Sequence, residues 1–288
     1  MAKVMPNDSG ARSERVWLIT GATSGFGRAL AEAAVGAGDL VVGAARNPDR
    51  LDDLVAAHPG RVAAVQLDVT DTRRCAAVAD EVAARFGRID VLVNNAGRTQ
   101  VGALEETTER ELRDLFDLHF FGPAMLTRAV LPHMRRAGRG AVVQMSSVGG
   151  QVTAPGFGAY CATKFALEGL TQTLSQEVDF GVTFLIVEPG AFRTGLFNPA
   201  AAYLSAPRPE YAATVGPTRD YVQSGDGSQA GDPARAAQAI LTALDAPDPP
   251  LRLVLGGDAI DRIRDGLESL TAELARWDAL GRDTAFGT

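Results

Sequence analysis

Short apolar runs alternate along this chain with longer segments that carry apolar side chains at helical spacing. The runs cover residues 16–19, 40–45, 62–67, 89–93, 141–145, 182–187 and 251–255. Short strands that alternate with helices of about ten or more residues are typical of βαβ units, which form a parallel sheet with right-handed crossovers. The pattern therefore predicts an α/β fold.

The segments between these runs are the predicted helices. The segment at residues 108–136 is apolar along one side but contains Gly122-Pro123, which predicts either one bent helix or two helical segments. We expect a mobile tail over residues 1–14 and a single domain over residues 15–288, because the start is polar and rich in turn-forming residues. The other predicted helices cover residues 28–35, 49–57, 71–86, 233–244 and the amphipathic end at 260–280.

Composition and charge argue against several classes of protein. The 288 residues are 46% hydrophobic and 22% charged, and the net charge of −7 without a basic stripe argues against a nucleic-acid partner. Cys75 and Cys161 lie far apart without metal-ligand spacing, so we expect a reducing compartment and no metal site. No apolar segment reaches the roughly 18 residues that a membrane helix needs, so we expect a cytoplasmic protein without membrane contact.

Glycines separate the first predicted strand from the first predicted helix. The loop reads Thr20-Gly21-Ala22-Thr23-Ser24-Gly25-Phe26-Gly27. Glycine at such positions lets backbone amides approach a pyrophosphate at the positive end of the helix. The spacing differs from the G-x-G-x-x-G pattern, and glycines that serve only a tight turn are the alternative interpretation.

The end of the second predicted strand bears on cofactor choice. An acidic residue there favours NAD, whereas this chain has Ala45 followed by Arg46. A guanidinium can hold a phosphate through two parallel hydrogen bonds, so the sequence favours NADP(H). The alternative is that Arg46 is a surface residue before the Asn47-Pro48 turn.

Tyr160 and Lys164 stand four residues apart and would share one face of a helix. A nearby ammonium favours the phenolate, so we expect the lysine to lower the tyrosine pKa and to make the phenol a useful proton donor near neutral pH. Ser147 follows the run at residues 141–145 and could direct its hydroxyl into the same crevice. The alternative is a packed ring beside a solvated amine, because such a pair also occurs by chance.

Residues 191–231 contain many prolines, glycines and aromatic residues, and we predict a long irregular insert there. An insert beyond the carboxyl end of a strand usually covers a ligand-binding crevice, and its aromatic side chains favour an apolar wall for the substrate. The alternative is a mobile surface excursion.

Four elements of the sequence, in order, resemble those of the short-chain dehydrogenase/reductase family. They are the glycine loop at residues 20–27, the Asn94-Asn95-Ala96-Gly97 element, Ser147 with Tyr160 and Lys164, and Pro189-Gly190 with Thr194. The resemblance covers roughly residues 16–255, and several elements in register are far more specific than one. The region around Tyr160 is similar to the NADP-using branch of ketone, retinol and steroid reductases.

The resemblance implies a doubly wound Rossmann-type fold with a seven-stranded parallel sheet flanked by helices. It implies that Tyr160 is the general acid, that Ser147 binds the carbonyl oxygen of a ketone, and that Lys164 holds the nicotinamide ribose. Homodimers or homotetramers would form through the helices near residues 108–136 and 158–180. The implied contacts to NADP(H) are Gly21, Thr23, Ser24, Gly25, Phe26, Gly27, Asp68, Val69, Asn95, Ala96, Gly97, Pro189, Gly190 and Thr194, together with Tyr160 and Lys164.

One position departs from the family pattern. The family often has a catalytic asparagine in the middle of the long helix, and His119 occupies that place here. The implied role depends on the main-chain carbonyl, which histidine also supplies, so we expect His119 to belong to the catalytic set. An imidazole that titrates near pH 6.5 and a hydrogen-bonded core histidine are both open interpretations.

The leading hypothesis is an NADP(H)-dependent oxidoreductase that acts on a ketone or a secondary alcohol of small to medium size. A non-catalytic nucleotide-binding sensor or scaffold is one alternative, and an epimerase or dehydratase on the same fold is another. The sequence leaves the substrate, the direction and the stereochemistry open.

Overall fold

Seven parallel strands form the central sheet of the protein, which is described by a computed structural model over residues 14–198 and 201–286. The sheet order is β3-β2-β1-β4-β6-β7-β9, and every neighbouring pair is parallel. This confirms the predicted Rossmann-type fold. The expected tail lies, except for Glu14, outside the described residues. The strands are β1 Val16–Thr20, β2 Leu40–Ala45, β3 Val62–Gln66, β4 Val91–Asn94, β6 Gly140–Met145, β7 Val182–Pro189 and β9 Arg252–Leu255.

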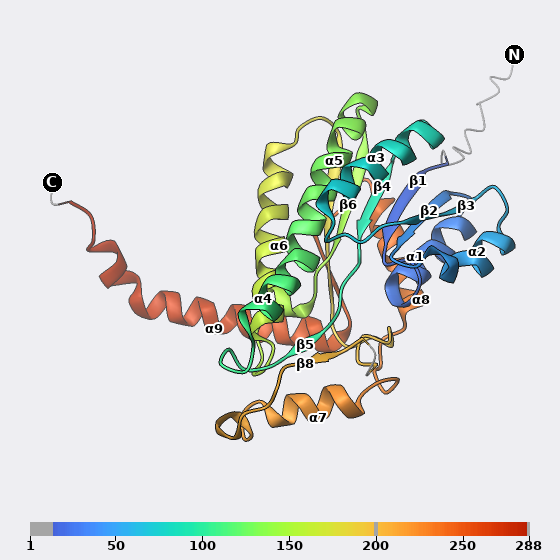
Figure 1. Ribbon diagram of the computed structural model, residues 1–288. Coiled ribbons are helices and arrows are strands. Elements are labelled where there is room, and N and C mark those ends of the chain that lie inside the picture. Colours follow the sequence, from blue (N-terminus) through green and yellow to red (C-terminus); the bar gives the residue numbers. More distant parts are fainter. Residues whose placement is uncertain (1–13, 199–200, 287–288) are drawn as a thin grey trace, which may run out of the picture.

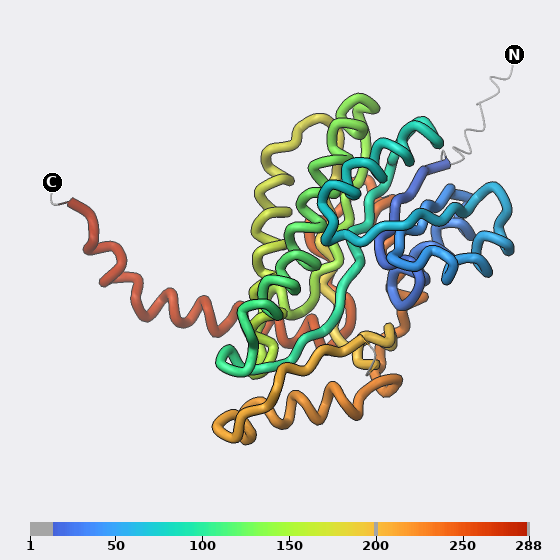
Figure 2. The backbone as a smooth tube through the Cα atoms, viewed as in Figure 1, coloured from blue at the N-terminus to red at the C-terminus, as the bar shows by residue number. Residues whose placement is uncertain are grey.

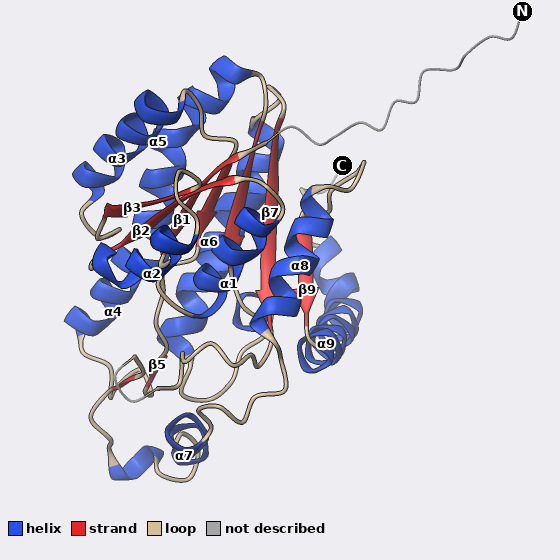
Figure 3. Cartoon of the chain, turned by 90° about the vertical axis from the view of Figure 1, so that its right-hand side faces the viewer, coloured by secondary structure: helices blue, strands red, loops and turns tan. Residues whose placement is uncertain are grey.

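Helices cover both faces of this sheet (Figures 1 and 3). On one face, α1 and α8 contact each other over a core that includes Trp17, Leu30 and Ile240; on the other, α3 and α5 cover a core that includes Leu18 and Leu126. Strands buried on both faces explain the nearly continuous apolar runs in the sequence. The helices are α1 Gly25–Gly36, α2 Asp52–Ala57, α3 Thr72–Phe86, α4 Glu109–Phe116, α5 Gly122–Ala137, α6 Gly158–Glu177, α7 Gly216–Ser224, α8 Pro233–Leu244 and α9 Gly257–Arg282.

The long segment between β4 and β6 consists of two helices joined by a π-helical turn at Asp117–Phe121. A capping box of Thr108 and Glu111 starts α4. Gly122 follows the π turn and packs so closely on β3–α3 that a Cβ there would lie 2.7 Å from the carbonyl oxygen of Val69. The segment is therefore two helical segments, one of the two predicted forms, and the interruption is the π turn that ends directly before Gly122-Pro123.

The insert at residues 191–231 is more regular than the sequence suggested. Its described part contains α7 and a short strand, β8 Tyr203–Leu204, which pairs in parallel with β5 Gln100–Val101. Val215 and Val222 are buried against Val101. The rest of the described insert is largely irregular, as expected, and α7 is held by its buried residue Val222 and by Val215, which precedes its first turn.

Candidate active site

The Ser147, Tyr160 and Lys164 side chains lie together where β6 ends and α6 begins. Ser147 forms a hydrogen bond with the Tyr160 hydroxyl group. The Lys164 Nζ atom lies 5.7 Å from the centre of the Tyr160 ring and donates a hydrogen bond of 2.8 Å to the carbonyl oxygen of Met145. The fold therefore brings the three expected side chains to one place, and a contact with the last residue of β6 holds the lysine.

The charge states of this trio differ from the expectation. Burial raises the pKa of Tyr160 to about 12, although the hydrogen bond with Ser147 acts in the opposite direction. Burial also lowers the pKa of Lys164 to about 8, against the attraction of Glu168. The expectation that Lys164 lowers the tyrosine pKa is therefore wrong for the protein chain alone, because desolvation of the phenolate dominates. The phenol is protonated at neutral pH, which is the state that a proton donor needs.

His119 is buried in the π turn and bridges two elements of the site. Its Nε2 atom accepts a hydrogen bond of 3.2 Å from the backbone N–H of Arg98, and its Nδ1 atom lies 3.0 Å from Oγ1 of Thr163. A backbone N–H only donates, so the proton of the neutral ring must be on Nδ1 and point toward Thr163. Thr163 in turn donates to the carbonyl oxygen of Tyr160 at 2.7 Å.

The imidazole does not titrate near pH 6.5. Burial, followed by the positive charges of Lys164 and Arg98, lowers the pKa of His119 well below its ordinary value. The ring meets Tyr160 edge to face. Of the two interpretations left open by the sequence, the hydrogen-bonded core histidine fits the geometry, and the titrating group does not.

The glycine loop lies beside the other expected cofactor residues. Gly25 has a φ angle of +54°, and a Cβ there would lie 2.9 Å from the carbonyl oxygen of Thr194. A Cβ on Gly27 would lie 2.3 Å from the carbonyl oxygen of Gly21 and 2.5 Å from Nδ2 of Asn95. The glycines are therefore required by close approach of the loop, the Asn94-Asn95-Ala96-Gly97 element and the segment after β7.

The start of α1 suits an anionic group. Ser24 is the N-cap residue but makes no capping hydrogen bond through its side chain, and the first turn contains no acidic residue. The first backbone N–H groups of a helix have no partner within it and carry a partial positive charge. This helix start lies at the carboxyl end of β1, next to β4, where the strand order reverses and where doubly wound sheets bind nucleotides. The residues present thus fit a dinucleotide pyrophosphate.

Asn95 and its neighbours join the ends of β1 and β4. The Asn95 side-chain amide donates to the carbonyl oxygens of Thr20 and Gly21 at 2.9 and 3.3 Å, and the backbone N–H groups of Asn95 and Ala96 donate to Oγ1 of Thr20. Gly97 packs against the His119 ring. The sequence indicated Thr20 only as part of the glycine loop. In the structure, its hydroxyl group joins the ends of β1 and β4 through these hydrogen bonds.

The expected adenosine-binding residues lie at the ends of β2 and β3. Arg46 is exposed directly after β2, and its backbone carbonyl accepts a hydrogen bond of 3.2 Å from Gln66. Asp68 is exposed after β3 and accepts hydrogen bonds from Thr70, whereas Val69 is buried. The side chains of Arg46 and Asp68 are therefore at the correct edge of the sheet for a ribose and an adenine.

Pro189 ends β7, and Gly190 leads into the insert. Gly190 donates to the carbonyl oxygen of Leu255 at 2.9 Å and packs against Asp258. Phe26 of α1 contacts Phe192, with ring centroids 5.1 Å apart. The segment that carries Thr194 is thereby fixed against the glycine loop.

The insert forms an apolar wall near Tyr160. Phe157 contacts Tyr160, with ring centroids 6.0 Å apart, and packs against the buried cluster of Val101, Val215 and Val222. Buried Glu106 binds two residues of the insert. It accepts a hydrogen bond of 2.8 Å from the backbone N–H of Arg208 and one of 2.6 Å from the guanidinium of Arg219.

A buried network of carboxylates was not expected from the sequence. Glu168 accepts hydrogen bonds from Ser146 at 2.5 Å and Gln151 at 2.9 Å, and the same Gln151 amide donates to Glu188 at 3.0 Å. Arg252 lies 3.2 Å from Glu188. Burial and then the charge of Glu168 raise the pKa of Glu188 to about 7. Two features of the sequence could have indicated this network: Glu168 lies on the buried face of α6, and Glu188 lies within the apolar strand β7.

The described ranges contain no group of three or more His, Cys, Asp or Glu side chains arranged to hold a metal ion. Among the helices formed by the described residues, none combines the length and the apolar character that a membrane span requires.

Comparisons with known proteins agree with this geometry. A profile of the short chain dehydrogenase family matches residues 15–203. Oxidoreductase BOA17 of Botryotinia fuckeliana (strain B05.10) is 36% identical over 273 residues, which are 94% of this chain and 99% of that protein. The crystal structure of a short-chain dehydrogenase from Streptomyces avermitilis is 62% identical with a TM-score of 0.90, and the match covers 95% of this chain and 99% of that one.

Two more distant structures contain nucleotides. A short chain dehydrogenase/reductase from Burkholderia phymatum in complex with NAD is 26% identical, with a TM-score of 0.79 and coverage of 91% and 95%. A metagenomic short-chain oxidoreductase in complex with NADP is 27% identical, with a TM-score of 0.68 and coverage of 85% and 98%. With the profile match over more than half of the chain, these findings establish that this protein belongs to the short-chain dehydrogenase family of oxidoreductases.

Proposed function

We propose that this protein is an NADP(H)-dependent oxidoreductase that interconverts a ketone and a secondary alcohol. The observation that carries the proposal is the convergence of Ser147, Tyr160 and Lys164 at the carboxyl end of β6. The nicotinamide would supply or accept the hydride when it is bound. The protein would supply the proton and the orientation.

In the direction of reduction, the protonated phenol of Tyr160 donates its proton to the carbonyl oxygen of the substrate. Ser147 hydrogen-bonds that oxygen and also contacts the phenol, so it aligns donor and acceptor. The Lys164 ammonium stabilises the phenolate that remains, since the charge lies one helical turn away. His119 keeps Tyr160 in place as a neutral imidazole, through Thr163.

The cofactor would lie across the carboxyl edge of the sheet. The residues proposed to hold it are the N-terminal turn of α1, Asn95 with Ala96 and Gly97, Asp68 and Val69, and the segment from Pro189 to Thr194. Arg46 is exposed and free of acidic partners among the described residues, which supports a preference for the additional phosphate of NADP(H).

The substrate would be an apolar ketone of small to medium size. The wall beside Tyr160 consists of Phe157 and the insert, and its lining is apolar or aromatic. An apolar pocket with few polar groups binds by shape and orients its ligand through those groups.

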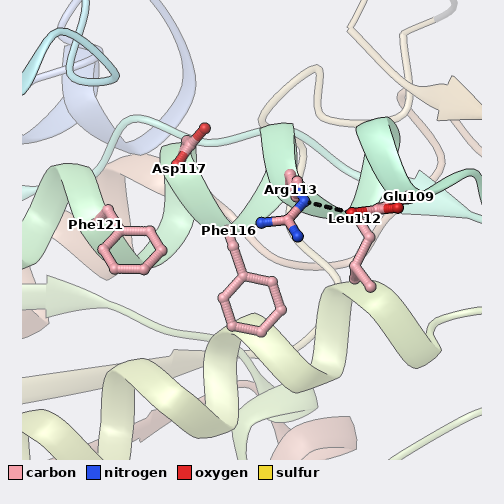
Figure 4. A pocket seen from close by; sticks show the side chains of 6 residues that line it. All are labelled: Glu109, Leu112, Arg113, Phe116, Asp117 and Phe121. Atoms are coloured by element: carbon pink, nitrogen blue, oxygen red, sulfur yellow. Dashed lines mark hydrogen bonds and ion pairs between the residues drawn. The ribbon is translucent and has the colours of Figure 1, made fainter.

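A second copy of the chain would bind on the face made by α4, the π turn and α6. Figure 4 shows a groove on this face, lined by Leu112, Phe116 and Phe121 together with the Glu109–Arg113 ion pair. Phe121 and Phe165 are 46% and 45% exposed. These apolar residues support the expected homodimer or homotetramer, and we refer to this surface as the α4–α6 face.

A single-turnover assay tests the proposed activity. The purified protein is saturated with NADPH and mixed with a panel of cyclic and aromatic ketones, and nicotinamide absorbance is followed. Oxidation of NADPH with at least one ketone is expected. Tight NADPH binding without oxidation by any ketone would support a sensor or scaffold instead, and substrate conversion without net redox change would support an epimerase or dehydratase.

A further inference from the structure

The last helix, α9, leaves the body of the protein after its first turns. Ala259 and Ile263 are buried, and Gly266 packs on Val152, where a Cβ would lie 2.6 Å from the valine Cγ1 atom. Beyond Gly266, every described residue of α9 is exposed. Figures 1 and 2 show that this outer part projects away from the rest of the molecule.

An apolar stripe runs along the whole helix. Starting from buried Ile263, large apolar residues follow at alternating steps of four and three: Leu267, Leu270, Leu274 and Trp277. At about 100° per residue, these positions lie on the same side of the helix as Ile263. The face that the body covers in the first turns therefore continues, uncovered, along the outer turns. We call Leu267, Leu270, Leu274 and Trp277 the α9 stripe.

The α9 stripe is exposed along its whole length. Its four side chains are between 55% and 70% exposed, and Leu280 next to them is 65% exposed. Apolar residues at alternating steps of three and four form the seam along which one helix packs against another. A contiguous apolar surface of this kind marks an interaction site.

Two features indicate a second copy of this chain as the partner. The helix α9 starts against β9 and the turn before α6, and it projects on the side of the molecule where α4 and α6 lie (Figure 1). The exposed Phe121 and Phe165 belong to the α4–α6 face, where a second copy is proposed to bind. The projecting helix therefore carries its stripe to the same side of the molecule as the proposed contact between copies.

Charge argues against a lipid surface as the partner. Helices that bind membrane surfaces carry many Lys and Arg residues on their polar face. The α9 helix has more acidic than basic residues, namely Asp258, Asp261, Asp265, Glu268, Glu273 and Asp278 against Arg262, Arg264, Arg276 and Arg282. The chain as a whole has a net charge of −7. Apolar contact is what can hold two such acidic copies together.

We infer that α9 is an arm whose apolar stripe packs on a second copy of this chain and stabilises the oligomer. The inference rests on the proposed α4–α6 contact for its geometry but not on the proposed reaction. It would stand even if the protein acted on a different substrate.

Sedimentation equilibrium of the full-length protein tests the inference with two matched double variants. Leu270→Glu/Leu274→Glu places two carboxylates in the stripe. Ala272→Glu/Ala279→Glu places the same two charges on the opposite, exposed side of α9. The wild-type protein is expected to be oligomeric, the stripe variant to have a dissociation constant raised about 100-fold or more, and the control to be unchanged.

Helix content from circular dichroism shows whether α9 itself survives the substitutions. If the glutamates reduce it, Leu270→Ala/Leu274→Ala keeps the helix propensity and is expected to raise the dissociation constant about tenfold. A monomeric wild-type protein, or a stripe variant with the wild-type dissociation constant, would overturn the inference. A monomer that binds vesicles of mixed neutral and anionic lipid would overturn it as well and would assign the stripe to a lipid surface.

Discussion

The imidazole of His119 meets the ring of Tyr160 edge to face, with centroids 5.5 Å apart and planes at 87°. The same histidine is joined to the Tyr160 backbone through Thr163 and to the loop after β4 through Arg98. One neutral side chain thus fixes the position of the proposed proton donor relative to the strand ends where the nucleotide would bind. The side chain of His119 thus has a structural role at a position whose expected role depended only on its main-chain carbonyl.

Replacing His119 should slow the reaction without changing its pH dependence. His119→Phe keeps a ring of similar shape but leaves the Arg98 N–H and the Thr163 hydroxyl without their partner, at a cost of about 1–3 kcal/mol. We expect kcat to fall by about 5- to 150-fold. The pH profile of kcat/KM should keep its shape, because the pKa of His119 lies well below neutral already.

Thr163→Val is the matched control for this effect, since it removes the same hydrogen bond from the other side. The double variant should lose little more than either single variant, because both act through one link. Loss of an ionisation near pH 6.5 in His119→Phe would contradict a positioning role and would instead indicate proton transfer by the imidazole.

Arg46→Ala should weaken NADPH binding by about 1–3 kcal/mol, the scale of a hydrogen bond to a charged group, and should leave NADH binding nearly unchanged. Fluorescence titration with each cofactor measures both. Arg110→Ala, which removes an exposed guanidinium on α4, controls for the change in net charge. Equal losses for NADPH and NADH in the Arg46 variant would refute the proposed selectivity.

The Glu168–Glu188 pair should make stability depend on pH. The folded pKa of Glu188, about 7, lies above the ordinary value of 4.5, so the folded state binds more protons between these two values. Its contribution is fully present below about pH 4.5 and is lost as the pH rises through about 7. The wild-type protein should therefore lose stability relative to Glu188→Gln across this window.

Urea unfolding of both proteins at several pH values gives the difference directly. We expect it to change by roughly 1–3 kcal/mol between pH 4.5 and pH 8, in favour of the variant at the higher pH. Groups remote from Glu188 titrate equally in both proteins and cancel, so the difference reports the Glu168–Glu188 pair. A difference that stays constant with pH would show that Glu188 is ionised throughout.

The sheet and the grouping of Ser147, Tyr160 and Lys164 could be predicted from the sequence, because both depend on local patterns. Apolar runs bounded by glycine or polar residues gave the strands, and the four-residue step from Tyr160 to Lys164 placed both on one helix face. The start of α5 at Gly122-Pro123 was also predictable, since proline is tolerated in the first turn of a helix but not in its interior.

The remaining features depend on contacts between distant segments. The raised pKa of Tyr160 results from burial of the side chain by the fold. The spacing of residues along the sequence does not show how deeply a side chain is buried. The link from His119 to Thr163 joins the π turn to α6, and Glu168 meets Glu188 only because β7 lies beside α6. The pairing of β5 with β8 involves two residues from each strand, too few to give a periodic signal.

The proton-donor role of Tyr160 is the central claim, and the rate of hydride transfer in Tyr160→Phe tests it most directly. Phenylalanine keeps the ring and its contacts with His119 and Phe157 but removes the acidic oxygen. Measured in single turnover with NADPH and the best ketone substrate, the rate should fall by about 10²- to 10⁴-fold, while the dissociation constant for NADPH stays the same. A rate within about threefold of the wild-type value would contradict the assignment, because general acid catalysis contributes far more than that.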